Sequence, residues 1–176
     1  MENTKSKLRE SIRLGRQGNS SHFNLALLTD TSEFEASQVV ASYCSYGDEP
    51  DTKLLNELIL KVGKRLLLPK LLPDKNLEFR FWDGDPKNLS SNGKIQEPIG
   101  AKFTGAIDLM IIPALAVDLH GNRLGQGGGS YDRVLQTFPG TTVALINENE
   151  LISELSVEPH DVPVKIVLTP TRLIRF

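Results

Sequence analysis

The glycines between positions 121 and 129 are the part of this sequence whose composition and spacing most clearly point to chemistry. Five of the chain's 14 glycines fall in these nine positions, and Arg123 and Arg133 lie near the two ends of the segment. Closely spaced glycines let the backbone bend until several N–H groups converge, and a helix that starts after them adds partial positive charge. The segment therefore predicts a phosphate-binding loop.

Two familiar phosphate motifs do not fit this segment. A P-loop ends in Gly-Lys-Ser or Gly-Lys-Thr, whereas here Gly129 is followed by Ser130 and Tyr131. A dinucleotide fingerprint would need a third glycine at position 130. A nucleotide would therefore be held by another geometry, and the alternative of a flexible glycine-rich turn without a ligand stays open on the residues alone.

Charged side chains that suit a phosphate ligand occur next to the loop and at the N-terminus. Asp132 falls in the first turn of the helix expected after the loop, where it can hold Mg²⁺ or simply complement the helix dipole. Lys5, Arg9 and Arg13 recur every four residues, which places them on one face of an N-terminal helix. On the residues alone, the favoured interpretation of that face is an ordinary solvated surface.

Alternating helices and strands are expected to position these groups. Helical periods are expected at 4–16, at 22–28 with a continuation toward 34, at 53–62 after a cap at Thr52, at 130–136 and near 150. Strands are expected at 39–44, 65–68, 77–82, 107–112, 142–146, 164–168 and 173–176, with Pro69 ending the second and a long surface loop at 83–98. The pattern predicts a single α/β domain, residues 1–176, of three layers around a largely parallel sheet.

Composition excludes several classes of protein. The chain is 39% hydrophobic and 24% charged, which is typical of a globular protein. Its apolar runs are too short to cross a bilayer, and its net charge of −2 argues against a nucleic-acid partner. One cysteine excludes an internal disulfide, so we expect a cytoplasmic protein.

Motifs along most of the chain resemble the 5-formyltetrahydrofolate cyclo-ligases, also called methenyltetrahydrofolate synthetases. The longest match is the apolar run at 107–113 followed by the glycine-rich segment as far as Arg133. Shorter matches are Lys5 with Arg9, the segment 47–52, Gly63-Lys64, Leu68-Pro69, Glu97-Pro98 and the segment 160–164.

This resemblance implies a reaction and a fold. Family members close 5-formyltetrahydrofolate to 5,10-methenyltetrahydrofolate, using ATP and Mg²⁺ and releasing ADP and phosphate. The implied partners are ATP and a folate, with or without a polyglutamate tail, and a monomer is favoured. The implied fold is similar to the group of sugar-phosphate isomerases and CoA-transferases.

The resemblance also implies roles for individual residues. Arg123 and Asp132 would be catalytic, and Asp132 and Asp161 would bind the metal. ATP would contact Lys5, Arg9, Arg123, Leu124, Gly125, Gln126, Gly127, Gly128, Gly129, Ser130 and Tyr131. The folate would contact Cys44, Glu49, Gln126, Gly127, Gly128, Gly129 and Ser130.

This chain departs from the family pattern at three positions. Ser130 stands where an aromatic residue is common, Gln126 where an aromatic or basic residue is common, and Lys165 where an acidic residue is common.

Two other functions are alternatives. A nucleotide-binding module of the same fold would have lost turnover, although the presence of both Asp132 and Asp161 argues against it. A phosphate-ester isomerase would need a general base in the loop and would ignore ATP.

Overall fold

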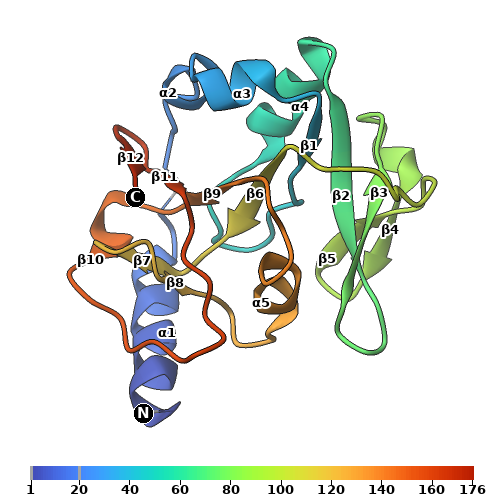
Figure 1. Cartoon of the computed structure of the whole chain (residues 1–176). Helices are drawn as coiled ribbons and strands as arrows, with labels where there is room; N and C mark the ends of the chain where they lie inside the picture. Colours follow the sequence, from blue (N-terminus) through green and yellow to red (C-terminus); the bar gives the residue numbers. More distant parts are fainter. Residues whose placement is uncertain (1, 20) are drawn as a thin grey trace.

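A seven-stranded sheet forms the centre of the molecule, in the order β12-β11-β9-β6-β1-β2-β3. The computed structural model describes residues 2–19 and 21–176 (Figure 1). The inner pairs are parallel, and both edge strands are antiparallel to their neighbours. The expectation of a largely parallel sheet is confirmed. The strands are β1 (Val39–Ala41), β2 (Arg65–Leu71), β3 (Leu77–Phe81), β6 (Leu109–Pro113), β9 (Thr141–Leu145), β11 (Ile166–Leu168) and β12 (Leu173–Arg175).

Helices cover both faces of this sheet. Helices α2 (Ala26–Thr29), α3 (Ser32–Ala36) and α4 (Lys53–Lys61) pack on one face, and α5 (Ser130–Leu135) packs on the other. Successive strand residues point to opposite faces, so Val40 lies in the core under α4 whereas its neighbours Val39 and Ala41 lie in the core under α5. Continuous apolar strands of this kind fit a sheet that is buried on both sides.

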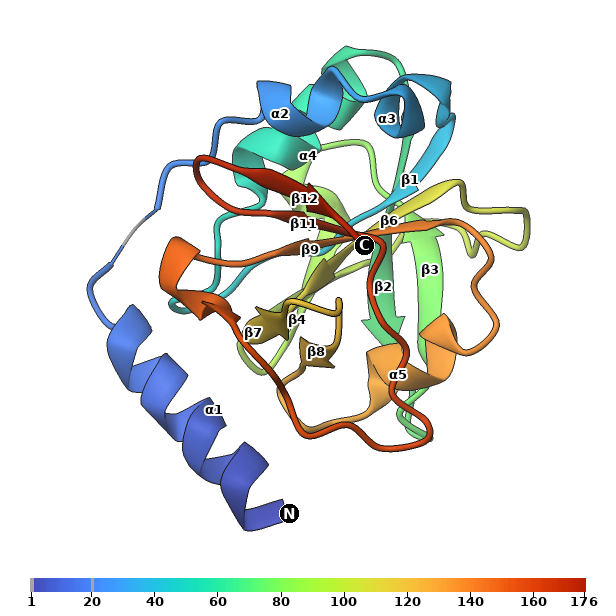
Figure 2. The ribbon, with the colours of Figure 1, turned by 60° about the vertical axis from the view of Figure 1, so that its left-hand side comes forward.

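The N-terminal helix α1 (Glu2–Arg16) lies apart from these layers and packs against a small sheet (Figure 2). That sheet consists of β7 (Ala116–Asp118), β8 (Arg123–Leu124) and β10 (Leu151–Ile152). The short helix η2 (Glu148–Glu150) directly precedes β10 in the chain. Leu8 and Ile12 of α1 pack against buried Leu115, Ala116 and Leu124. Strand β8 leads into the glycine-rich loop, so α1 is held next to that loop.

A buried ion pair fixes the end of α1. Arg16 Nε lies 2.6 Å from Glu150 Oε1, and the two side chains are each 4% exposed. The Arg16 Nη2 group donates to Glu150 Oε2 at 2.8 Å and to the Ala114 carbonyl at 2.7 Å. Glu150 also accepts from the Asn147 backbone N–H at 2.7 Å, so a single carboxylate anchors both α1 and the start of η2.

The segment 83–98 is not the long loop that its composition suggested. It contains a short helix η1 (Pro86–Asn88) and a hairpin of β4 (Leu89–Asn92) with β5 (Ile95–Pro98). Gly93 makes the hairpin turn with φ of 62°, a left-handed conformation that glycine adopts without strain. Glu97 of β5 accepts from the Leu71 backbone N–H at 2.9 Å and ties the hairpin to β2.

Three other boundaries differ from expectation. Strand β2 continues through Pro69 because β1 has already ended, so the missing N–H is not needed by a neighbour on that side. Thr31 splits the expected long second helix by capping α3, since its hydroxyl accepts from the Phe34 N–H. Thr52 begins α4 without capping it, because its hydroxyl donates to the Tyr43 carbonyl at 2.6 Å.

Strand β1 ends at Ala41 and is shorter than the expected 39–44, because the chain that follows it bonds to the start of α4. The Tyr43 carbonyl accepts from the Thr52 hydroxyl and the Asn56 amide and not from a neighbouring strand. After β1 the chain passes through α4 to β2, which pairs with one side of β1, and β6 pairs with its other side. The sheet therefore extends in both directions from β1, which makes this a topological switch point. Open α/β sheets bind ligands at such a switch point, beyond the carboxyl ends of the strands.

Across the described residues, we find no helix that is both long enough and apolar enough to span a membrane.

Candidate active site

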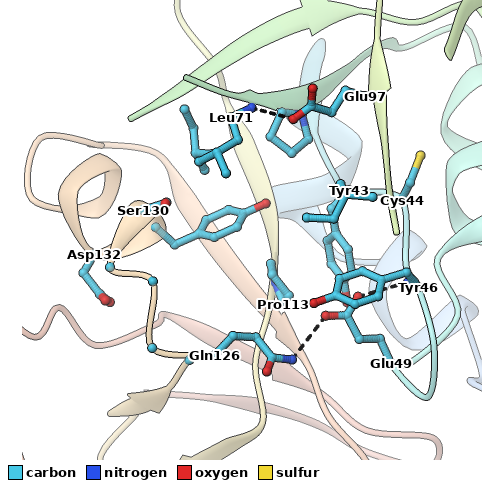
Figure 3. Close-up of a pocket in the computed structure, with 18 of the residues that line it drawn as sticks. Tyr43, Cys44, Tyr46, Glu49, Leu71, Glu97, Pro113, Gln126, Ser130 and Asp132 are labelled. Atoms are coloured by element: carbon cyan, nitrogen blue, oxygen red, sulfur yellow. Dashed lines mark hydrogen bonds between the residues drawn. The ribbon is translucent and has the colours of Figure 1, made fainter. Parts of the chain in front are cut away.

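A pocket of about 200 Å³ lies at the carboxyl ends of β1 and β6 (Figure 3). Residues after β1 form one wall, the glycine-rich loop with the start of α5 forms another, and the hairpins β2–β3 and β4–β5 contribute apolar side chains. The lining residues are Tyr43, Cys44, Tyr46, Glu49, Pro69, Leu71, Leu77, Ile95, Gln96, Glu97, Pro113, Arg123, Gly125, Gln126, Gly127, Gly128, Gly129, Ser130, Tyr131 and Asp132.

The glycine-rich loop is anchored at both ends by Arg123. Its guanidinium pairs with Asp132 through Nη2 and donates to the Pro113 carbonyl through Nη1 at 3.2 Å. Within the loop, Gly127 has φ of 100° and Gly129 has φ of 72°, which L side chains rarely adopt. The loop therefore has a defined shape that depends on its glycines.

Glu49 presents a carboxylate to the opposite side of the pocket. Its Oε2 accepts from the Tyr46 backbone N–H at 3.2 Å, and its Oε1 accepts from Gln126 Nε2 at 3.4 Å (Figure 3). Burial raises the pKa of Glu49 above the usual value, although these two hydrogen bonds act against the change. A carboxylate in this position can accept N–H groups from a ligand.

Arg13 holds the side chain of Gln126 from outside the pocket. Its guanidinium donates to Gln126 Oε1 at 2.7 Å and to the Gln126 backbone carbonyl at 3.3 Å. Because Gln126 in turn donates to Glu49, a continuous chain of hydrogen bonds joins α1 to the far wall of the pocket.

The other two cations of the same helix face also reach the predicted site. Arg9 Nε donates to the Gly125 carbonyl at 3.0 Å, and Lys5 Nζ lies 3.0 Å from Asp161 Oδ2. Burial alone would raise the pKa of Asp161, but hydrogen bonds from the Glu158 N–H and the Lys5 ammonium hold it below the usual value. One face of α1 thus contacts the loop through Arg9 and the predicted metal ligand Asp161 through Lys5.

The structure gathers most, but not all, of the predicted residues around one pocket. Cys44, Glu49, Arg123 and the segment 125–132 line it. Lys5, Arg9 and Asp161 lie outside its lining: Arg9 contacts the loop at the Gly125 carbonyl, whereas Lys5 pairs with Asp161. Leu124 is buried, with its side chain packed in the core beneath α1. The roles assigned to these residues stay predictions.

The two predicted metal ligands are separate carboxylates, each paired with a cation. Asp132 pairs with Arg123 and Asp161 with Lys5, and the two aspartate side chains are 27% and 16% exposed. Within residues 2–19 and 21–176 there is no group of three or more His, Cys, Asp or Glu side chains that could hold a metal. Mg²⁺ needs no such group, because one or two carboxylates with substrate phosphates and water complete its oxygen shell. Each carboxylate is thus a ligand of the chemical type that Mg²⁺ binds together with a polyphosphate.

Arg13, Tyr43 and Tyr46 are among the site residues to which the sequence alone assigned no role. Arg13 follows Arg9 on the same helix face, and that spacing was the signal that could have assigned it to the loop. Tyr43 and Tyr46 follow the end of β1, and no local pattern distinguishes them from core aromatics.

Comparisons with known proteins agree on one family. The 5-formyltetrahydrofolate cyclo-ligase family matches residues 3–170. The 5-formyltetrahydrofolate cyclo-ligase of Mycolicibacterium smegmatis is 36% identical over 145 residues, which are 77% of this chain and 75% of that protein. The 5-formyltetrahydrofolate cyclo-ligase of Escherichia coli K12 is 34% identical over 143 residues, which are 76% of this chain and 79% of that protein. The NMR structure of Aquifex aeolicus 5,10-methenyltetrahydrofolate synthetase matches with a TM-score of 0.83 and 30% identity, over 97% of this chain and 92% of that one.

Proposed function

Because the chain belongs to the 5-formyltetrahydrofolate cyclo-ligase family, we propose that it couples its reaction to ATP hydrolysis at the glycine-rich loop. The enzyme cyclises 5-formyltetrahydrofolate to 5,10-methenyltetrahydrofolate. In the proposal, the folate occupies the pocket, and the phosphates of ATP lie between the loop and α1. The observation that carries it is that the loop forms one wall of the pocket while its Gly125 carbonyl and Gln126 bind cations of α1.

The chemistry explains why ATP is needed. Ring closure removes the formyl oxygen, which is a poor leaving group until it is phosphorylated. We propose that this oxygen attacks the γ-phosphorus and releases ADP. The folate's second nitrogen then attacks the activated carbon and loses its proton to solvent, and phosphate leaves with the former formyl oxygen. Phosphoryl transfer mainly requires positioning and charge neutralisation, so no protein nucleophile is needed.

The pocket supplies complementary groups for the folate. Glu49 accepts N–H groups of the pterin ring, in place of the Gln126 amide that it accepts from in this structure. The apolar side chains of Leu71, Leu77 and Ile95 line the pocket beside Pro69 and suit the flat p-aminobenzoyl ring of the folate.

The charged groups on the α1 side suit the phosphates. Arg9 lies against the loop, Lys5 lies one helical turn away on the same face of α1 and pairs with Asp161, and Arg123 lies at the start of the loop. Asp132 and Asp161 would hold Mg²⁺. When bound, the metal neutralises charge that develops on the transferred phosphoryl group. Arg123 keeps the Asp132 carboxylate oriented through their ion pair.

Several finer expectations belong to the same proposal. We propose a fold similar to the sugar-phosphate isomerase and CoA-transferase group, a monomer, and acceptance of folates with or without a polyglutamate tail. The cytoplasmic location stays a prediction based on the single cysteine.

The proposal is tested by mixing the protein with MgATP and 5-formyltetrahydrofolate and following the near-ultraviolet absorbance of the methenyl product. The expected result is product in equal amount with ADP, and none when ATP, Mg²⁺ or folate is omitted. A non-hydrolysable ATP analogue should bind without giving product. Product formed with the analogue would overturn the phosphorylation step, and binding of both substrates by folded protein without turnover would favour the binding-module alternative.

Changing Glu49 to glutamine is expected to weaken folate binding while stabilising the unliganded protein. Loss of a charged hydrogen-bond acceptor costs about 1.5–3 kcal/mol, which corresponds to roughly one to two decades in Kd. Since burial raises the pKa of Glu49, its ionised form destabilises the fold, and this cost appears as pH rises through the folded-state pKa. Glutamine should therefore raise the unfolding midpoint at pH 7 but not at pH values where the carboxyl is protonated.

Calorimetric titration with folate and with MgATP, together with thermal unfolding at the two pH values, checks this expectation. Glu57→Gln on the exposed surface of α4 is the matched control and should change neither binding nor stability appreciably. Unchanged folate affinity with weakened ATP binding would show that the two substrates were assigned to the wrong sides of the loop.

A further inference from the structure

Tyr43 lines the pocket, and its hydroxyl is a buried polar group without a hydrogen-bond partner among the described residues. The residue is 4% exposed. Leaving such a group unsatisfied is unfavourable, and buried hydroxyls without a partner are uncommon. An unpartnered polar atom at a pocket wall is explained when a ligand supplies its partner.

The backbone of Tyr43 is held in place independently of its hydroxyl. Its carbonyl accepts from the Thr52 hydroxyl at 2.6 Å and from Asn56 Nδ2 at 3.0 Å, both from the α4 side. These two bonds orient the residue where the chain leaves β1. The hydroxyl is therefore not needed to fix the position of the residue, so a role toward a ligand can be tested separately from a role in folding.

The neighbourhood of this hydroxyl defines what it can do. Figure 3 shows Tyr43 and Glu49 on the same side of the pocket. Burial and the charge of Glu49 raise the pKa of Tyr43 well above its usual value, so the phenol stays protonated at neutral pH and can donate. The Glu49 oxygens accept from Tyr46 and Gln126 and not from this phenol. The wall thus offers one donor and one acceptor to a ligand.

We propose that the Tyr43 hydroxyl donates a hydrogen bond to the ring carbonyl oxygen of the pterin, next to the ring N–H groups that Glu49 accepts. A pterin lactam presents a carbonyl acceptor beside an N–H donor, which complements this pair of protein groups. Tyr43 is then a residue that selects a 4-oxo pteridine. The inference rests on the proposed placement of the folate in this pocket.

Tyr43→Phe tests the proposal by removing only the hydroxyl. Loss of one neutral hydrogen bond should raise KM for 5-formyltetrahydrofolate roughly three- to tenfold, with kcat and KM for ATP changed less than about twofold. The unliganded variant should unfold at the same temperature as the parent or higher, because a buried unsatisfied hydroxyl is gone.

Ser42→Ala is the matched control. Its Oγ is also buried without a partner among the described residues, yet Ser42 does not belong to the pocket lining. This variant should show the same direction of stability change and an unaltered KM for folate. A rise in KM for Ser42→Ala equal to that of Tyr43→Phe would overturn the proposal, because it would reflect packing at the end of β1.

A second measurement changes the ligand as well as the protein. Wild-type protein should bind 5-formyltetrahydrofolate more tightly than its analogue with a 4-amino group in place of the ring carbonyl, and Tyr43→Phe should narrow this difference about three- to tenfold. Two results would rule out the contact: an equal preference for the 4-oxo ligand in both proteins, or an unchanged KM for 5-formyltetrahydrofolate in Tyr43→Phe. In either case, turnover by the wild-type protein would still support the proposed function. Absence of turnover in the wild-type protein would instead contradict the proposed function.

Discussion

Asp132→Asn is expected to lower turnover by about 10²–10³-fold while leaving the protein folded. The magnitude is that of losing one group that stabilises charge developing in the transition state. Asn keeps the shape of the side chain and an oxygen that can accept from Arg123, so the start of α5 should stay in place. What is lost is the negative charge that we propose holds Mg²⁺ beside the loop.

Two measurements identify the reason for such a loss. The first is turnover measured over a range of Mg²⁺ concentrations. Loss of a metal ligand raises the Mg²⁺ concentration that gives half-maximal turnover, whereas loss of an orienting contact lowers kcat and leaves that concentration unchanged. Asp30→Asn, at an exposed carboxylate that ends α2, is the matched control and should behave as wild type. Asp132→Asn with wild-type turnover and an unchanged Mg²⁺ midpoint would exclude the metal role.

Arg16→Met is expected to be the most destabilising single change considered for this molecule. It removes one partner of a buried pair and leaves Glu150 without its counter-charge, which typically costs about 3–5 kcal/mol. For a chain of this size that corresponds to a fall of roughly 6–20 °C in the unfolding midpoint. Because Arg16 also binds the Ala114 carbonyl, the end of α1 should loosen and the KM for ATP should rise.

Thermal unfolding of three variants checks this expectation. The double variant Arg16→Met/Glu150→Met should recover much of the loss, since no unpaired charge remains. Arg172→Met removes a pair of the same chemistry, with Glu148, whose side chains are 53% and 38% exposed, and should cost less than about 1 kcal/mol. Equal losses for Arg16→Met and Arg172→Met would show that burial of the first pair does not govern its contribution.

The parts of the candidate site whose local structure could be predicted from the sequence are short, continuous segments. The loop and the helix that follows it are recognisable because glycines and Asp132 lie within a dozen positions. The carboxyl ends of β1 and β6 could likewise be expected at one edge, since both are short, continuous apolar runs. The distant pairing of Lys5 with Asp161 could not be inferred from spacing, because it depends on how α1 crosses the loop region.

The errors in the fold prediction also have physical reasons. Pro69 was expected to end its strand, but a proline ends a ladder only where a neighbour needs its N–H, and β1 is already over at that point. The two-residue turn Gly93-Lys94, with glycine at its first position, is a hairpin signal that the surrounding polar residues concealed. Tyr43 gave no signal at all, because a buried hydroxyl without a partner is a property of the packed chain alone.

The chain of hydrogen bonds from Arg13 through Gln126 to Glu49 has a thermodynamic consequence for the two substrates. A folate that takes over the Glu49 carboxylate releases the Gln126 amide, and so alters the group through which α1 is tied to the loop. If this release changes the free energy of ATP binding, then ATP that binds first must change the free energy of folate binding by the same amount. The enzyme would then show reciprocal substrate synergism or antagonism, whose sign is set by whether α1 binds phosphate better with Arg13 released or with Arg13 held.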